Sequence, residues 1–189
     1  MQLKNKIALI DFDKTLIKVD SLGQIFLKEK LYFNNKLFIY GSLLFFCKCL
    51  PKNKQLFIRS LFKKNLLKKI KLLSEKKLDD YISNFKEKLN RDLVKGIKSE
   101  NYDLIYVLSA SEESIIEKVL DGELKVDAII SNKINQLSKN FRTCWGEEKL
   151  HRLKALIEIE KVKEIHVYTD SNDDKPLLDI ATKEIILKY

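Results

Sequence analysis

The sequence is poor in residues that interrupt regular structure or cross-link a chain. Its 189 residues include only 5 Gly, 2 Pro and 3 Cys. So little Gly and Pro excludes collagen-like, linker-like and disordered low-complexity chains. Cys47, Cys49 and Cys144 are too few and too unevenly spaced for a disulfide framework, which indicates a reducing compartment. With 45% apolar residues, the chain has enough material for one buried core.

The sequence also lacks a long apolar segment. Near the N-terminus, only residues 7–10 are continuously apolar before acidic residues begin, which is too short for the apolar region of a secretory signal. The longest apolar stretch, residues 37–50, contains Lys48 and falls short of the roughly 18 residues that a transmembrane helix needs. We therefore expect no transmembrane segment and a cytoplasmic protein.

Arginine is scarce although the chain is basic. The 36 basic residues exceed the 27 acidic ones by 9, but only 4 of them are Arg. A lysine-dominated surplus is typical of a solvated surface, whereas Arg leads in nucleic-acid recognition, so we expect no nucleic-acid partner. The surplus is uneven, because residues 18–92 carry a net charge of +11 and the remainder carries −2.

Short apolar runs and helical patterns alternate over much of the chain. Runs rich in β-branched residues predict strands at residues 7–10, 104–108, 128–130, 165–168 and 185–187. Helical spacing predicts helices at residues 112–120, 147–159 and 176–181. This order predicts an α/β fold with a Rossmann-like parallel sheet covered by helices.

Residues 18–92 differ, because they contain no strand pattern and space their apolar residues at three and four. We expect several short helices here, inserted after the first strand, with residues 1–17 and 93–189 forming the Rossmann-like core. Pro51 should interrupt the helices once, and Ser74 should begin another. Residues 37–50 are expected to pack in the core of this helical insertion. A dimer contact or a membrane-surface face is the alternative for this stretch.

Two carboxylates follow the first predicted strand. Asp11 and Asp13 lie directly after residues 7–10, in the sequence Asp-Phe-Asp-Lys-Thr. Ligands of an open parallel sheet bind at the carboxyl ends of its strands. A carboxylate pair there suits a hard cation such as Mg²⁺, and it equally suits a nucleophile with an acid/base partner.

Three further segments place polar residues at predicted element ends. Ser109 follows the second strand, where a hydroxyl beside a helix start suits an anion, and Ser111 is expected to cap that helix. Lys149 lies in the first turn of a helix opened by Gly and two acids, and Asp170 and Asp174 follow the strand at residues 165–168. Each of these segments, taken alone, is common in proteins.

In this order the four segments resemble the motifs of the haloacid dehalogenase superfamily of Mg²⁺-dependent aspartyl phosphotransferases, and within it the phosphoserine-phosphatase-like branch. The residues that carry the resemblance are Asp11, Asp13 and Thr15, then Ser109, then Lys149, then Asp170, Ser171, Asp174 and Pro176. The chain departs from the pattern at Thr169, where the family commonly has Gly, and this change puts the local loop geometry in question.

The resemblance implies a role for each matched residue. Asp11 would attack phosphorus and Asp13 would act as general acid and base. Mg²⁺ would be bound by Asp11, the backbone carbonyl of Asp13 and Asp170. Lys149 would neutralise charge on the nucleophile and on a phosphoryl oxygen, and Ser109 would donate to another phosphoryl oxygen. Thr15 would shape the turn after the acids, and Asp174 would act through water or orient the loop.

The resemblance implies that residues 18–92 form the small all-helical cap that this branch carries between its first and second motifs, and that residues 1–17 and 93–189 form the catalytic core. A cap of this kind closes over a small-molecule site, which points to a small-molecule phosphomonoester as the substrate. Asp20 lies where phosphoserine phosphatases face the substrate ammonium, and Arg59 could form a fork with a carboxylate. Both together would fit phosphoserine, and Asp20 alone would fit an amino-alcohol phosphate such as phosphoethanolamine. A sugar or polyol phosphate would need neither residue. The alternatives are phosphoryl transfer to another acceptor and a basic module that binds anionic surfaces. The protein could be a monomer or a homodimer.

Overall fold

The computed structural model describes residues 6–46 and 49–188. The strands within these residues are β1 (Lys6–Ile10), β2 (Leu104–Glu112), β3 (Ala128–Asn132), β4 (Glu164–Thr169) and β5 (Lys183–Ile186). They form one sheet in the order β3-β2-β1-β4-β5, and every neighbouring pair is parallel. The expected Rossmann-like parallel sheet is confirmed. Strand β2 continues four residues beyond the predicted range, and β5 begins two residues before it.

The described chain between β1 and β2 forms the helical insertion. Its elements are α1 (Ser21–Lys28), η1 (Leu31–Phe33), α2 (Asn35–Phe46), α3 (Lys52–Ile70), α4 (Glu75–Glu87) and α5 (Arg91–Ser99). The remaining elements are α6 (Glu113–Leu120), η3 (Ile134–Gln136), α7 (Glu147–Lys154), η4 (Ile159–Lys161), η5 (Asn172–Asp174) and α8 (Lys175–Leu178). The predicted boundary after residue 92 falls in the first turn of α5.

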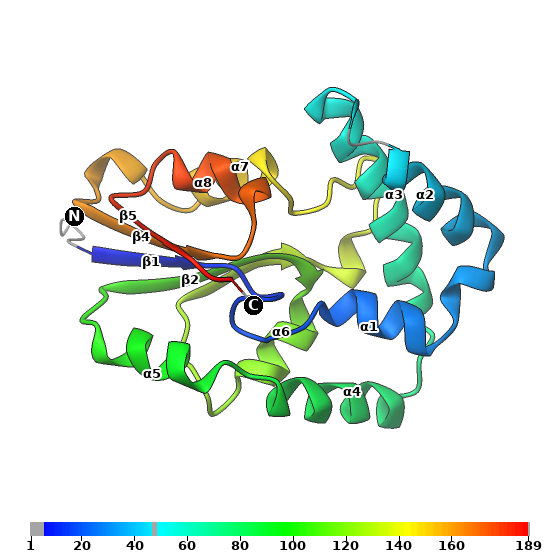
Figure 1. The fold of residues 1–189 in the computed structure, drawn as a ribbon, viewed down its shortest axis with the longest axis horizontal. Coiled ribbons are helices and arrows are strands. Elements are labelled where there is room, and N and C mark those ends of the chain that lie inside the picture. The colour runs from blue at the N-terminus through cyan, green and yellow to red at the C-terminus, as the bar shows by residue number, and fades with distance from the viewer. Residues whose placement is uncertain (1–5, 47–48, 189) are drawn as a thin grey trace.

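Strand β1 is central because its side chains are buried on both faces of the sheet. Ala8 and Ile10 pack in one apolar cluster, and Ile7 and Leu9, which point to the opposite face, pack in another. Helices α5 and α6 lie on the first side of the sheet, and α7 and α8 cover the second (Figure 1). The run of four consecutive apolar residues therefore reflects a strand between two helical layers.

Side-chain caps begin the helices of the insertion where the sequence offers them. Asp20 accepts a hydrogen bond from the Gly23 N–H at 2.8 Å and caps α1. Ser74 caps α4, as predicted, by accepting from the Lys77 N–H. Helix α3 follows Pro51 directly, which confirms the expected break. Helices α1, α2 and α3 lie beyond the carboxyl ends of the strands (Figure 1), where the first two motifs also end.

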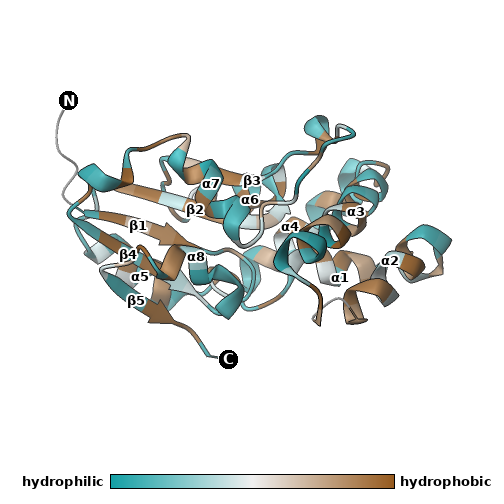
Figure 2. Ribbon diagram, turned by 90° about the horizontal axis from the view of Figure 1, so that it is seen from above, coloured by the Kyte–Doolittle hydropathy of each residue, from teal (hydrophilic) through white to brown (hydrophobic). Residues whose placement is uncertain are grey.

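The apolar stretch at residues 37–50 was predicted to pack in the core of the cap, and this prediction is wrong for most of it. Leu37 is fully buried, but the side chains of Phe38, Phe45 and Phe46 are 63%, 78% and 72% exposed. The reason is that α2 packs against α3 and η1 along one side only. Its outer side faces solvent at the end of the molecule (Figure 2). No described helix is both long and apolar enough to span a bilayer.

Phe85 of α4 tests how strongly the insertion and the sheet share one core. It is fully buried in the cluster that contains Ile10 of β1. We expect Phe85→Ala to lower the free energy of unfolding by about 3–5 kcal/mol, because it removes a large buried side chain and leaves a cavity. Urea denaturation measures this change. The exposed Leu156 provides the control, since Leu156→Ala should change stability by less than about 0.5 kcal/mol. Equal effects would contradict the shared core.

Candidate active site

A cavity of about 430 Å³ opens where the carboxyl ends of the strands face the helical insertion. Its lining unites the predicted site residues Asp11, Asp13, Asp20, Arg59, Ser109, Lys149, Asp170 and Asp174. Thr15 does not line the cavity, but it is buried and donates a hydrogen bond to Asp11 Oδ2 at 3.4 Å. Residues that are up to 163 positions apart along the chain therefore meet at one edge of the sheet.

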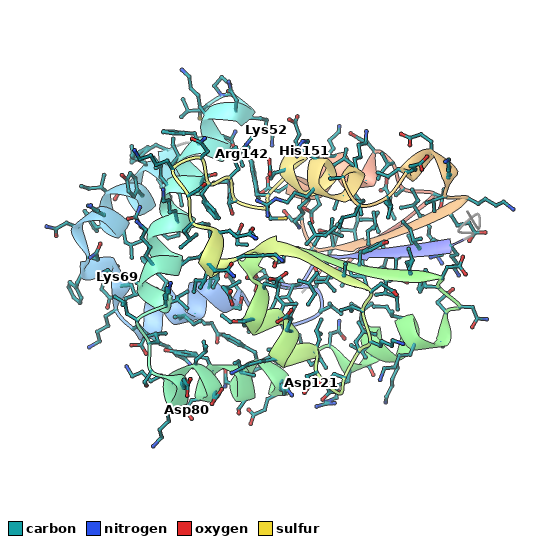
Figure 3. All side chains as sticks on the ribbon, turned by 180° about the vertical axis from the view of Figure 1, so that it is seen from behind. Lys52, Lys69, Asp80, Asp121, Arg142 and His151 are labelled. Carbon is teal, nitrogen blue, oxygen red and sulfur yellow. The ribbon has the colours of Figure 1, made fainter. Side chains whose placement is uncertain are left out.

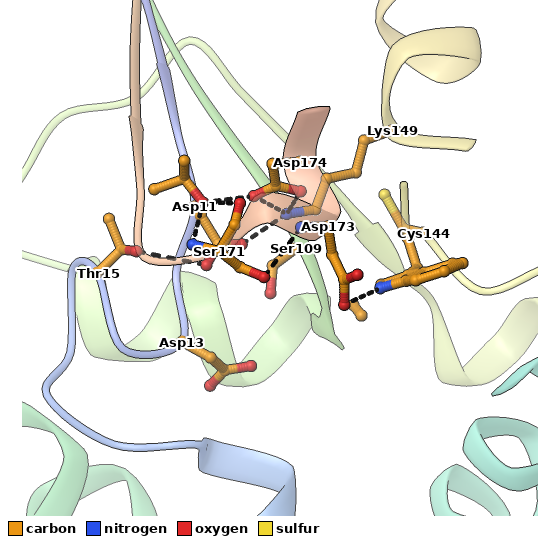
Figure 4. Close-up of polar contacts among 12 residues, drawn as sticks. Asp11, Asp13, Thr15, Ser109, Cys144, Lys149, Ser171, Asp173 and Asp174 are labelled. Carbon is orange, nitrogen blue, oxygen red and sulfur yellow. Dashed lines mark hydrogen bonds and ion pairs between the residues drawn. The ribbon is translucent and has the colours of Figure 1, made fainter. Parts of the chain in front are cut away.

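The ammonium group of Lys149 lies between two carboxylates. Its Nζ is 2.7 Å from Asp11 Oδ1 and 2.7 and 2.9 Å from the two oxygens of Asp174 (Figure 4). All three side chains are nearly buried. Burial disfavours the charged form of Lys149, but the attraction of Asp11 and Asp174 outweighs it and raises the Lys149 pKa above its ordinary value. Lys149 is therefore a permanent cation in this cavity.

Helix α7 holds Lys149 in place through its own anchored first turn. Gly146 precedes the helix with a φ of 56°, a conformation that side chains other than hydrogen disfavour. Glu148 is buried and accepts from Arg152 Nε at 3.0 Å, and Arg152 Nη1 donates to the backbone oxygen of Ser131 at 2.6 Å. This network fastens α7 to β3. The sequence pattern gave no sign of Arg152, because an arginine at this spacing resembles an exposed helix surface.

Asp11 and Asp13 leave the end of β1 in different directions. Asp11 points to Lys149, whereas Asp13 points toward the insertion (Figure 4). Asp13 Oδ1 accepts from the Ser21 N–H at 2.7 Å, and Asp13 Oδ2 accepts from the Ser111 hydroxyl. The turn between strand and insertion requires a left-handed residue at Lys14, where φ is 54°. The structure therefore gives the two carboxylates separate environments.

Both carboxyl groups have pKa values above the ordinary range for Asp. Burial raises the pKa of Asp11 to about 7, against the opposing effect of Lys149 and with further contributions from Asp174 and Asp13. Burial likewise raises the pKa of Asp13, and the charge of Asp20 adds to the effect. Raised pKa values of carboxyl groups in a cavity are typical of groups that transfer protons.

Ser109 and Ser111, the two serines near the end of β2, contact different parts of the site. Ser111 does not cap α6, because β2 continues to Glu112 and the side chain of Glu112 accepts from the Ile115 N–H at 3.2 Å. Ser111 contacts Asp13 instead. Ser109 lines the cavity, and its hydroxyl oxygen accepts from the Ser111 N–H at 3.0 Å. The sequence alone could not show that the strand extends beyond its apolar residues to Glu112.

Thr169 is buried and forms hydrogen bonds within the loop that follows β4. The Thr169 hydroxyl donates to Asp174 Oδ2 at 2.7 Å, and the Thr169 Oγ1 accepts from the Ser171 N–H at 3.1 Å. The loop that usually begins with Gly is thus fixed here by a side chain. Asp170 follows at the cavity wall, where burial raises its pKa and Lys14 opposes the rise.

A contact between the insertion and the core closes another side of the cavity. The Arg59 guanidinium of α3 lies 4.1 Å from the centre of the Trp145 ring and 3.6 Å from Asp173 Oδ2. Trp145 Nε1 donates to the same Asp173 oxygen at 3.0 Å. The sequence analysis missed Trp145 and Asp173, since one aromatic residue and one acid in a loop carry no pattern. Arg59 Nε is buried and has no partner among the described residues.

The residues present fit a magnesium ion, although no metal is part of the structure. Six carboxylates and four basic side chains line the cavity, so the acidic groups outnumber the basic ones. No compact cluster of three His, Cys, Asp or Glu side chains occurs within the described residues. Mg²⁺ needs only one or two carboxylates, with water and substrate phosphate completing its octahedron.

Sequence and structure comparisons place this chain among known proteins. The family model of haloacid dehalogenase-like hydrolases matches residues 8–179. The chain belongs to this family. No curated protein sequence matches it. Among solved structures, a protein of unknown function from Bordetella pertussis Tohama I superposes with a TM-score of 0.69 at 19% identity, over 97% of this chain and 90% of the other.

Two further solved structures share the fold of this hydrolase. A phosphoserine phosphohydrolase-like protein from Francisella tularensis subsp. tularensis SCHU S4 gives a TM-score of 0.59 at 19% identity, covering 96% of this chain and 86% of its own. A substrate-bound phosphoserine phosphatase gives 0.56 at 14% identity, covering 97% and 94%. The overall fold is therefore common to these proteins.

Thr169 offers a direct test of the loop at the end of β4. Thr169→Val keeps the shape of the side chain but removes both hydrogen bonds, leaving a buried Asp174 oxygen with one donor fewer. We expect the free energy of unfolding to fall by about 1–3 kcal/mol. Thr169→Ser keeps the hydroxyl and should lose less than about 1 kcal/mol. Urea denaturation distinguishes them, and a Val variant as stable as the Ser variant would show that the hydroxyl is dispensable.

Proposed function

We propose that this haloacid dehalogenase-like hydrolase is a Mg²⁺-dependent phosphatase that hydrolyses a small-molecule phosphomonoester through an aspartyl-phosphate. The main support is the position of Asp11, whose carboxylate is held at 2.7 Å by a buried ammonium group while Asp13 stands beside it with hydrogen bonds of its own. This arrangement provides one carboxylate oriented for attack and a second one suited to proton transfer.

In the first step, an Asp11 oxygen attacks phosphorus and the bond from phosphorus to the leaving alkoxide breaks. Asp13, whose pKa is raised by burial, would act as the general acid and give a proton to the alkoxide. The product alcohol leaves and the phosphoryl group stays on Asp11. The Ser21 N–H and the Ser111 hydroxyl fix the orientation of Asp13 for this transfer.

In the second step, water attacks the phosphorus of the aspartyl-phosphate. Asp13, now ionised, takes the proton of the water, and the bond between phosphorus and the Asp11 oxygen breaks. Inorganic phosphate is released, and Asp11 and Asp13 return to their starting states. Because Asp13 acts as acid first and as base second, one residue serves both steps.

The remaining residues would bind and neutralise the phosphoryl group. Lys149 is a permanent cation beside Asp11 and would attract a phosphoryl oxygen. Ser109 has a hydroxyl proton to donate, since its oxygen already accepts from the backbone. Mg²⁺, held by Asp11, Asp170 and the Asp13 carbonyl, would supply positive charge that offsets the repulsion between carboxylates and phosphate. Asp174 would hold Lys149 and the loop at Thr169 in position by accepting a hydrogen bond from each.

For the leaving group, we favour an amine-bearing molecule, because Asp20 is an acidic residue of the insertion that lines the cavity and would pair with an ammonium group. The insertion also contributes the basic Lys63 to this lining. Arg59 also lines the cavity, but its guanidinium already contacts Trp145 and Asp173. The substrate class is therefore a phosphoserine or an amino-alcohol phosphate such as phosphoethanolamine. Water as acceptor is part of the proposal, and recovery of phosphate on an added alcohol would identify a phosphotransferase instead.

Asp11→Asn tests the covalent step. The amide cannot form the acyl phosphate by direct attack, so turnover should fall by roughly a thousandfold or more. Phosphate release from phosphoserine, phosphoethanolamine, sugar phosphates and nucleotides is measured with Mg²⁺ and with EDTA. We expect metal-dependent release by the wild type only. Release unaffected by both EDTA and Asp11→Asn would contradict the mechanism.

Asp20→Asn tests recognition of the amine. Asn caps a helix as well as Asp does, so the bond to Gly23 and the stability of α1 should persist. Loss of the negative charge should raise KM for an amine-bearing phosphomonoester by about tenfold. The same variant should leave KM for a sugar phosphate unchanged. Equal KM changes for both substrate types would rule out Asp20 as the ammonium contact, whatever the outcome for Asp11.

A further inference from the structure

Helix α2 exposes one continuous apolar side. Phe38, Ile39, Leu43, Phe45 and Phe46 are all exposed, and their spacing places them on one half of the helix, together with Ser42. The opposite half contains Leu37, which is buried, and Leu44, which lines the cavity. No charged residue occurs from Leu37 to Phe46. A side of this size and composition is unusual on a solvated monomer.

Basic side chains gather at the first turn of α2. A hollow in the surface there is lined by Lys36 of α2 and by Lys68 and Lys69 of α3, together with the exposed side chains of Phe33 and Leu72 and otherwise only Asn residues. None of the three lysines forms an ion pair with a described carboxylate. Figure 3 shows Lys69 on the insertion, at the end of the molecule away from the strands' amino ends. The hollow thus offers unpaired positive charge next to aromatic and aliphatic groups.

The surrounding sequence contains no compensating acid. Residues 30–74 include ten Lys, one Arg and no Asp or Glu. A second copy of this chain placed against the same surface would bring two strongly positive surfaces together, which is unfavourable. The partner must therefore be anionic, and it must also accept a broad apolar side.

We propose that the side of α2 formed by Phe38, Ile39, Leu43, Phe45 and Phe46, together with Lys36, Lys68 and Lys69, docks on an anionic lipid bilayer. We call it the α2 face. Aromatic and aliphatic side chains would enter the boundary between head groups and acyl chains, while the lysines contact lipid phosphates. Since no described helix is long and apolar enough to span a bilayer, α2 would lie in the plane of the membrane.

Docking in this orientation would bring the candidate active site close to the lipid. Leu44 of α2 lines the cavity together with Phe26 of α1 and Phe62 of α3. The α2 face lies on the other side of the same helix, and a helix with its side chains is about 10 Å thick. The cavity would therefore stand one helix away from the head groups. The surface itself does not depend on the proposed reaction.

Co-sedimentation with phosphatidylcholine vesicles, with and without phosphatidylglycerol, tests the proposal on the full chain. We expect binding only to the phosphatidylglycerol vesicles, and weaker binding as salt is raised. Phe45→Ser combined with Phe46→Ser should weaken vesicle binding by at least about tenfold, because both rings are lost from the bilayer boundary. Lys68→Gln combined with Lys69→Gln should also weaken it, by roughly tenfold or more.

Leu156→Ser is the matched control, because Leu156 is exposed on the catalytic core and far in sequence from α2. It should bind vesicles as the wild type does. Circular dichroism and turnover of a soluble phosphomonoester establish that each variant is folded. No binding by the folded wild type, binding that survives the double Phe substitution, or equal binding to both vesicle types would overturn the proposal. So would a homodimer that the Phe substitutions dissociate while vesicle binding is absent.

Discussion

The buried ammonium of Lys149 between Asp11 and Asp174 is the interaction on which the rest of the site depends. A buried carboxylate is costly without a partner, and two of them share this one cation. The three residues come from the end of β1, the first turn of α7 and the loop after β4. Asp11 and Asp174 lie close together because β1 and β4 are neighbours in a parallel sheet, so the two strands end side by side at the same edge.

The acid/base candidate, Asp13, ties this centre to the helical insertion. Its oxygens accept from Ser21 at the start of α1 and from Ser111 at the end of β2. A second connection runs from Arg59 of α3 to Trp145 and Asp173 of the core. Movement of the insertion would therefore change the surroundings of Asp13, whereas Lys149 and Asp11 are held by the core alone.

The insertion separates its apolar and charged residues in a way that the core does not. In the core, the apolar run of the central strand β1 is buried on both faces of the sheet. In α2, one side packs toward α3 and the cavity while the other remains exposed beside a segment with no acidic residue. Burying these phenylalanines within the chain would need another element outside α2, and none of the described elements occupies that position.

The sequence by itself determined the parallel sheet, the four polar segments and the helical nature of the insertion, because a buried strand and an amphipathic helix leave local periodic patterns. It did not determine the end of β2, the role of Ser111, the use of Thr169 or the contact of Arg59 with Trp145. The prediction that α2 is buried was also wrong for most of its residues, since an apolar run has the same sequence pattern whether it is buried or exposed. Only the tertiary structure decided these points, because each depends on which distant residue lies opposite, and local pattern carries no information about that neighbour.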